Sequence, residues 1–98
     1  MKQELMCGVA KTVTDGLRDS QMQYEWAERA AGMGDQELAM KHLSEAKRRL
    51  SGVSEWMGIL DRYEEAKMPL AKALLEHYKG WHDELLRKVE RFHATAEA

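Results

Sequence analysis

The 98-residue sequence contains one cysteine and one proline, and it has no long apolar run. A single cysteine, Cys7, cannot form an internal disulfide, which favours a reducing compartment, the cytoplasm. A chain that is 44% hydrophobic with one proline is not typical of disorder or of a proline-punctuated β domain. A membrane span needs about 18 consecutive apolar residues, so we expect a soluble protein.

An excess of charge of one sign is also missing. Fifteen Lys and Arg residues balance seventeen Asp and Glu residues, for a net charge of -2. Such a chain has no extended field to attract nucleic acid or anionic lipid. The basic triplet Lys47-Arg48-Arg49 lies between Glu45 and Glu55, which is typical of a solvated face. We therefore expect neither a membrane nor a nucleic acid as a partner.

The strongest periodic signal follows Asp35. Apolar residues recur at alternating steps of four and three, at Ala39, Leu43, Ala46, Leu50, Val53, Met57 and Leu60. This heptad spacing predicts a helix over about 36–66 that packs along one side against other helices. Asp35 is the expected N-cap, and Gly32-Met33-Gly34 supplies the preceding turn.

Two further stripes predict helices on either side. The segment after Pro69 predicts a helix over about 69–94, and a tight turn is favoured between Arg62 and Met68. Its apolar positions are Leu70, Leu74, Tyr78, Trp81, Leu85, Val89, Phe92 and Ala96. The first third predicts a less regular helix over about 3–31, in which Gly16 leaves a break open. Its stripe is Val9, Val13, Leu17, Tyr24, Ala27 and Ala31.

These elements predict one all-α domain over residues 1–98. We expect an elongated up-down-up three-helix bundle, that is, a helical hairpin plus a third helix, completed by self-association into a homo-oligomer. Acid-before-base pairs four residues apart mark the solvated helix faces: Glu25/Arg29, Glu37/Lys41, Glu45/Arg49, Asp83/Arg87 and Glu84/Lys88.

A ridge of large residues runs beside the predicted heptad seam at seven-residue spacing. It consists of His42, Arg49, Trp56 and Tyr63. Amphipathic residues at the rim of a bundle can serve packing alone. Because Trp, Tyr and Arg dominate binding hot spots, these four are the candidate partner-binding residues. Further candidates, for a second face or the core, are Trp26, Tyr78 and Trp81.

A metal site is the alternative interpretation. Carboxylates and histidine inside a helical bundle suit a di-iron or di-manganese centre, and the candidates are Glu25, Glu28, His42 and Glu45. The heptad frame places Glu45 away from the seam, so the primary expectation is no metal and no cofactor. No Cys-x-x-Cys pair, phosphate-binding glycine loop or nucleophile motif is present, which predicts a protein that is not an enzyme.

Residues 20–63 resemble the helical hairpin of ferritin-like proteins and of small prophage-encoded proteins with such a hairpin. The resemblance rests on Tyr24-Glu25-Trp26-Ala27-Glu28, Gly34-Asp35, Ala39, His42-Leu43, Glu45-Ala46 and Arg49-Leu50. Ferritin-like metal sites use Glu-x-x-His, whereas this chain has Glu45-x-x-Arg48. The resemblance implies a phage origin and a regulator or inhibitor of a host protein. With the composition, it leads us to expect a non-enzymatic interaction module that binds itself and another protein.

Overall fold

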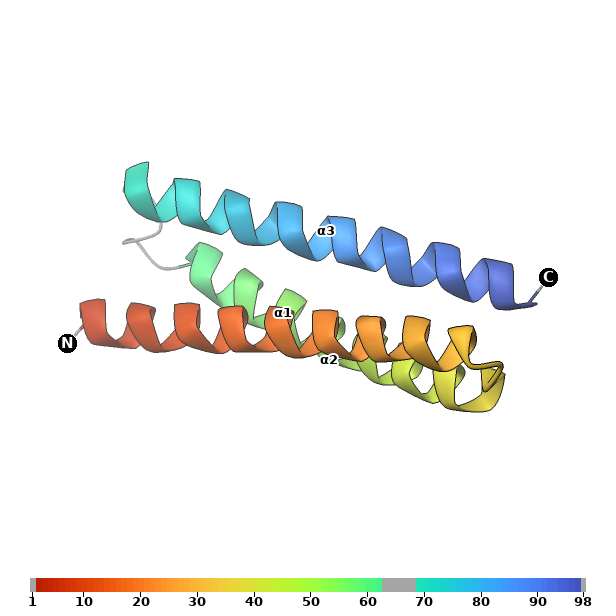
Figure 1. The fold of residues 1–98 in the computed structure, drawn as a ribbon. Coiled ribbons are helices and arrows are strands. Elements are labelled where there is room, and N and C mark those ends of the chain that lie inside the picture. Colours follow the sequence, from red (N-terminus) through yellow and green to blue (C-terminus); the bar gives the residue numbers. More distant parts are fainter. Residues whose placement is uncertain (1, 63–68, 98) are drawn as a thin grey trace.

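The computed structural model describes residues 2–62 and 69–97, and these form three helices. They are α1 (Lys2–Gly32), α2 (Gln36–Arg62) and α3 (Pro69–Glu97). The helices run up, down and up, and the described ranges contain no strand (Figure 1). The predicted all-α three-helix architecture is confirmed. The favoured turn before Pro69, and the predicted extension of the second helix to residue 66, fall outside the described residues.

The molecule is elongated, with principal extents of 49 × 19 × 16 Å. Its radius of gyration is 15.3 Å, against about 12.5 Å for a compact chain of this length. A rod of three helices has much surface for its volume. Side chains on its long faces are therefore available to a partner.

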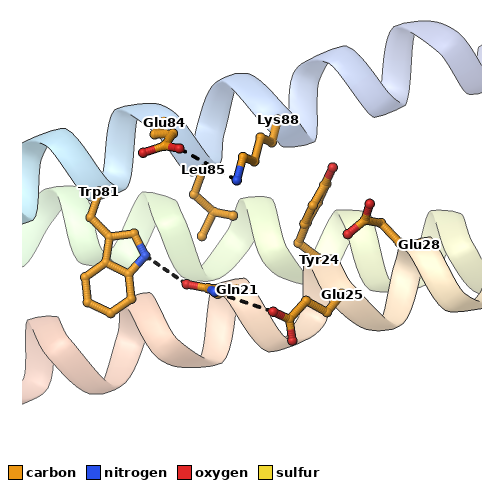
Figure 2. Close-up of a pocket in the computed structure, with 8 residues that line it drawn as sticks. All are labelled: Gln21, Tyr24, Glu25, Glu28, Trp81, Glu84, Leu85 and Lys88. Carbon is orange, nitrogen blue, oxygen red and sulfur yellow. Dashed lines mark hydrogen bonds and ion pairs between the residues drawn. The ribbon is translucent and has the colours of Figure 1, made fainter.

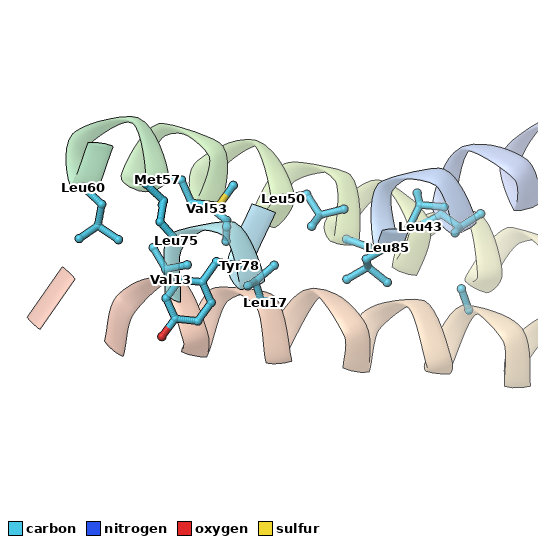
Figure 3. Close-up of a cluster of buried hydrophobic side chains, with 13 residues drawn as sticks. Val13, Leu17, Leu43, Leu50, Val53, Met57, Leu60, Leu75, Tyr78 and Leu85 are labelled. Atoms are coloured by element: carbon cyan, nitrogen blue, oxygen red, sulfur yellow. The ribbon is translucent and has the colours of Figure 1, made fainter. Parts of the chain in front are cut away.

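The heptad seam of α2 forms the centre of the core. All seven predicted seam residues are buried: Ala39, Leu43, Ala46, Leu50, Val53, Met57 and Leu60. All of them except Ala39 belong to one core cluster with Val13 and Leu17 of α1 and Leu75, Tyr78 and Leu85 of α3 (Figure 3). The sequence pattern thus predicted the face of α2 that both neighbouring helices cover.

The turn between α1 and α2 forms as the sequence predicts. Gly34 has a φ of 83°, a left-handed conformation that glycine adopts without strain. The amides of Gly34 and Asp35 donate to the carbonyls of Ala31 and Ala30 at 3.0 and 2.9 Å, which closes a Schellman motif. The Leu38 amide then donates to Asp35 Oδ1 at 3.1 Å, so Asp35 is the N-cap of α2.

Helix α1 continues unbroken through Gly16. At this position α1 lies close to α2, and the absence of a side chain on Gly16 leaves room for Val53. A Cβ at position 16 would lie 2.5 Å from Val53 Cγ2. The stripe predicted for this helix is correct at Val13, Leu17 and Ala27, and it missed three buried residues, Ser20, Gln23 and Ala30. Small side chains at the α1–α2 contact allow the two helices to approach each other closely.

Among the α3 stripe residues whose burial the structure describes, the prediction is wrong at one position. Leu74 is 41% exposed, and its neighbour Leu75 is buried in its place. His82 is also buried, and its Nε2 lies 3.1 Å from the carbonyl oxygen of Leu50, which can only accept. The Nε2–H therefore donates to α2 and ties α3 to the hairpin. A polar residue in the core stripe carries no apolar signal, so periodicity alone passed it over.

Candidate protein-binding surfaces

Three of the four candidate partner-binding residues lie on α2 beside its seam, on what we name the α1–α2 edge (Trp26, His42, Arg49 and Trp56). His42 Nδ1 lies 2.7 Å from Gln23 Oε1, and the ring of His42 meets that of Trp26 edge to face at 5.4 Å. His42 therefore bridges the two helices. The fourth candidate, Tyr63, lies outside the described residues.

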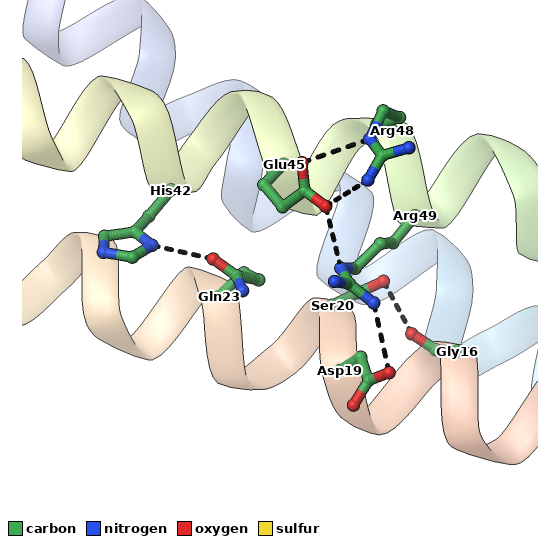
Figure 4. Close-up of polar contacts among 8 residues, drawn as sticks. All are labelled: Gly16, Asp19, Ser20, Gln23, His42, Glu45, Arg48 and Arg49. Carbon is green, nitrogen blue, oxygen red and sulfur yellow. Dashed lines mark hydrogen bonds and ion pairs between the residues drawn. The ribbon is translucent and has the colours of Figure 1, made fainter.

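Arg49 also bonds within its own chain (Figure 4). Its guanidinium donates to Asp19 Oδ2 at 3.2 Å, and its Nε forms an ion pair with Glu45 at 3.2 Å. Glu45 accepts two further hydrogen bonds from Arg48. The bonds from Arg48, together with the positive charges of Arg48 and Arg49, hold the pKa of Glu45 below its usual value.

The α1–α2 edge thus divides into a bonded part and an accessible part. His42 and Arg49 are engaged with α1, whereas Trp56 is 41% and Trp26 39% exposed. Both indoles have enough accessible surface to contact another molecule. Partner binding through this edge stays a prediction.

The four alternative metal-ligand residues lie on different parts of the bundle. Glu25 and Glu28 line a hollow between α1 and α3, whereas His42 and Glu45 have their partners along the α1–α2 edge. Within residues 2–62 and 69–97, no three His, Cys, Asp or Glu side chains form a group that could hold a metal ion. Glu45 is instead bound by two arginines.

A second surface, which the sequence patterns did not single out, is a groove between α1 and α3. Helices α1 and α3 contact each other less than either contacts α2. Between them lie two adjoining hollows of about 280 and 410 Å³, and Tyr24 and Lys88 line both. We call these hollows together the α1–α3 groove. Its aromatic residues are Tyr24, Trp81 and Phe92, all partly buried.

Two contacts of aromatic side chains cross the groove from one helix to the other, and Figure 2 shows the first of them. Trp81 Nε1 donates to Gln21 Oε1 at 3.1 Å, so the indole bridges from α3 to α1. The ring of Tyr24 meets that of Phe92 edge to face, with centroids 6.2 Å apart. Leu85 lies between Trp81 and Tyr24 (Figure 2) and is buried. Rings of this size keep the two backbones apart, and their outer surfaces remain accessible.

The two walls of the groove carry opposite charge. Glu25 and Glu28 lie on α1, whereas Glu84, Lys88 and Arg91 lie on α3, so the net charge is negative on the α1 wall and positive on the α3 wall; all five side chains are exposed. Tyr24 lies between the walls, and its pKa is raised by burial and by Glu28, while Arg91 acts in the opposite direction. Glu28 and Arg91 are therefore both near one phenol. On its own helix, Lys88 pairs with Glu84 at 3.7 Å.

One signal in the sequence could have found the groove. Leu74, Trp81 and Lys88 recur every seven residues on α3, directly beside the buried line of Leu75 and His82. A second seven-residue line containing a tryptophan marks a second half-buried face of a helix. Trp81 was predicted as part of the α3 stripe and as a candidate for a second face or the core, but that stripe merged the core line with the groove line.

Searches against protein-family models, curated protein sequences and solved structures gave no match for this chain. The resemblance to ferritin-like and prophage hairpins therefore stays a prediction. Among the described residues, every helix is too polar or too short in its apolar stretches to cross a membrane.

Proposed function

We propose that this protein is a non-enzymatic protein–protein interaction module that accepts an amphipathic helix of another polypeptide in its α1–α3 groove. The observation that carries the proposal is that Tyr24, Trp81 and Phe92 stand in a groove that the described chain leaves uncovered. Partly buried aromatic side chains are the usual anchors of protein interfaces. A groove between two helices is shaped for a third helix, whose apolar positions at i, i+3, i+4 and i+7 fit between the walls.

A display library of amphipathic 20-residue peptides tests this function without knowledge of the natural partner. Peptides enriched on the full-length protein are measured against Trp81→Ala and, as the matched control, Trp56→Ala. We expect Trp81→Ala to weaken binding at least tenfold, which is about 1.4 kcal/mol, and Trp56→Ala to leave it unchanged. Circular dichroism verifies that both variants remain folded.

Two results would contradict the groove as the binding surface. If Trp56→Ala weakens binding and Trp81→Ala does not, the α1–α2 edge is the interface. If no helical peptide is enriched, the groove does not recognise helices. Both variants remove an indole that is partly accessible, so their comparison separates the two surfaces.

A further inference from the structure

We infer that the occupant of the α1–α3 groove is a second copy of this chain, related to the first by a two-fold axis that runs along the groove. The inference rests on the proposed function, because it names the partner of the same groove; in this case the second copy places its α1 and α3 against the two walls, in place of a single helix between them. Its basis is the charge of the two walls and the surface area of the single chain.

The wall charges suit pairing of the groove with itself. Glu25 and Glu28 line one hollow together with Glu84 and Lys88, and Lys88 and Arg91 line the adjoining hollow, so the acidic side chains of α1 and the basic side chains of α3 lie at one level of the rod. A two-fold axis parallel to the helices places α1 of one copy opposite α3 of the other at the same level. The acidic wall of each copy then meets the basic wall of its partner, and the apolar side chains between the walls are enclosed.

The surface area of the chain agrees with a missing partner. The accessible surface is 6680 Å² for a mass of 11.3 kDa. Folded monomers of this mass expose about 5,700 Å², so this chain has about 950 Å² in excess. A standard interface buries about 800 Å² on each partner. The elongated shape thus exposes, over the whole chain, extra surface about as large as one side of a standard interface.

Charge reversal of each wall tests the inference with the full chain. The acidic-wall variant is Glu25→Lys with Glu28→Lys, and the basic-wall variant is Lys88→Glu with Arg91→Glu. Sedimentation equilibrium should show a wild-type dimer. In each variant alone both walls have one sign, so we expect the dimer dissociation constant to rise at least tenfold. An equimolar mixture of the two variants should recover the dimer, because every wall again meets its opposite.

Cysteine cross-linking tests the direction of the axis. In a Cys7→Ala background, the Glu28→Cys variant mixed with the Arg91→Cys variant should form the mixed disulfide, and Glu28→Cys alone should form little. Preferential linkage between two copies of the Glu28→Cys variant would overturn the parallel two-fold arrangement.

A wild-type chain that stays monomeric at several hundred micromolar, or a dimer that neither charge variant weakens, would overturn self-pairing through the groove. These outcomes are distinct from failure of the proposed function. A monomeric protein that still binds selected helical peptides in a Trp81-dependent manner retains the function with a different partner.

Discussion

The contact between α1 and α2 and the contact of α3 with these two helices are both made by long amphipathic helices. The two contacts differ in how closely the helices approach each other. In the hairpin, large buried residues such as Leu17 and Leu43 are interspersed with small ones, namely Gly16, Ala27 and Ala30 on α1 and Ala39 and Ala46 on α2. The α3 contact uses large side chains and leaves a groove beside α1. Small residues let helix backbones approach and close a seam, whereas aromatic residues hold helices apart. The volume of the residues at a helix contact thus determines whether the two helices pack closely or leave a groove between them.

The largest expected effect comes from truncating one leucine at each of the two helix contacts and comparing the losses of stability. Leu17 is fully buried in the hairpin, and Leu17→Ala should lower the free energy of unfolding by about 3 kcal/mol, because its closed surroundings cannot fill the cavity. Leu85 lies beside the groove, so Leu85→Ala should cost less, about 2 kcal/mol, since water and neighbours can enter.

Urea denaturation followed by circular dichroism measures both leucine variants. Leu74→Ala is the control, because Leu74 is 41% exposed and its truncation should cost under about 1 kcal/mol. Equal losses of unfolding free energy for Leu17→Ala and Leu85→Ala would mean that α3 packs as tightly against the other two helices as α1 packs against α2.

The second effect tests the close approach at Gly16. Gly16→Ala should destabilise the protein by about 1 kcal/mol, since overpacking against Val53 outweighs the gain in helix propensity. Gly8→Ala is the matched control on the same helix: a Cβ there meets nothing within 4 Å, so it should stabilise by up to about 1 kcal/mol.

Adding Val53→Ala to the Gly16→Ala background completes a double-mutant cycle. The second alanine should cost less there than in the wild type, because the clash is then absent. Additive losses would show that the contact between Gly16 and Val53 does not limit the approach of the two helices.

The difference between large apolar and small or polar contact residues also explains which buried positions could be predicted from the sequence. The α2 seam was predicted in full, because every one of its positions is apolar and the heptad is regular. On α1, periodicity missed Ser20 and Gln23, whose burial depends on close helix packing rather than on hydrophobicity. Ser20 bonds to the Gly16 carbonyl at 2.8 Å, which satisfies its hydroxyl.

The fold is confirmed, whereas the choice of His42, Arg49, Trp56 and Tyr63 as partner-binding residues stays a prediction. The ridge of His42, Arg49 and Trp56 was located correctly beside the seam, but single-helix spacing does not reveal which cross-helix partners occupy these side chains. The groove depends on the relative placement of α1 and α3, whose bridging residues Gln21 and Trp81 are 60 positions apart in the chain. Only the assembled bundle brings Tyr24 and Phe92 together.

The smallest expected effect is a shift in the pKa of Tyr24, which tests how close the charged residues of the two groove walls lie to its phenol. Its raised pKa means that the folded state favours the neutral phenol, so Tyr24 lowers stability as pH rises above about 10, the unfolded value. Glu28→Gln should bring this pKa back toward 10, and Arg91→Gln should raise it further. NMR titration of ¹³Cζ-labelled tyrosine measures each change, with Tyr24→Phe assigning the signal. A Tyr24 pKa that responds to neither substitution would place the charged walls too far from the phenol to form one groove.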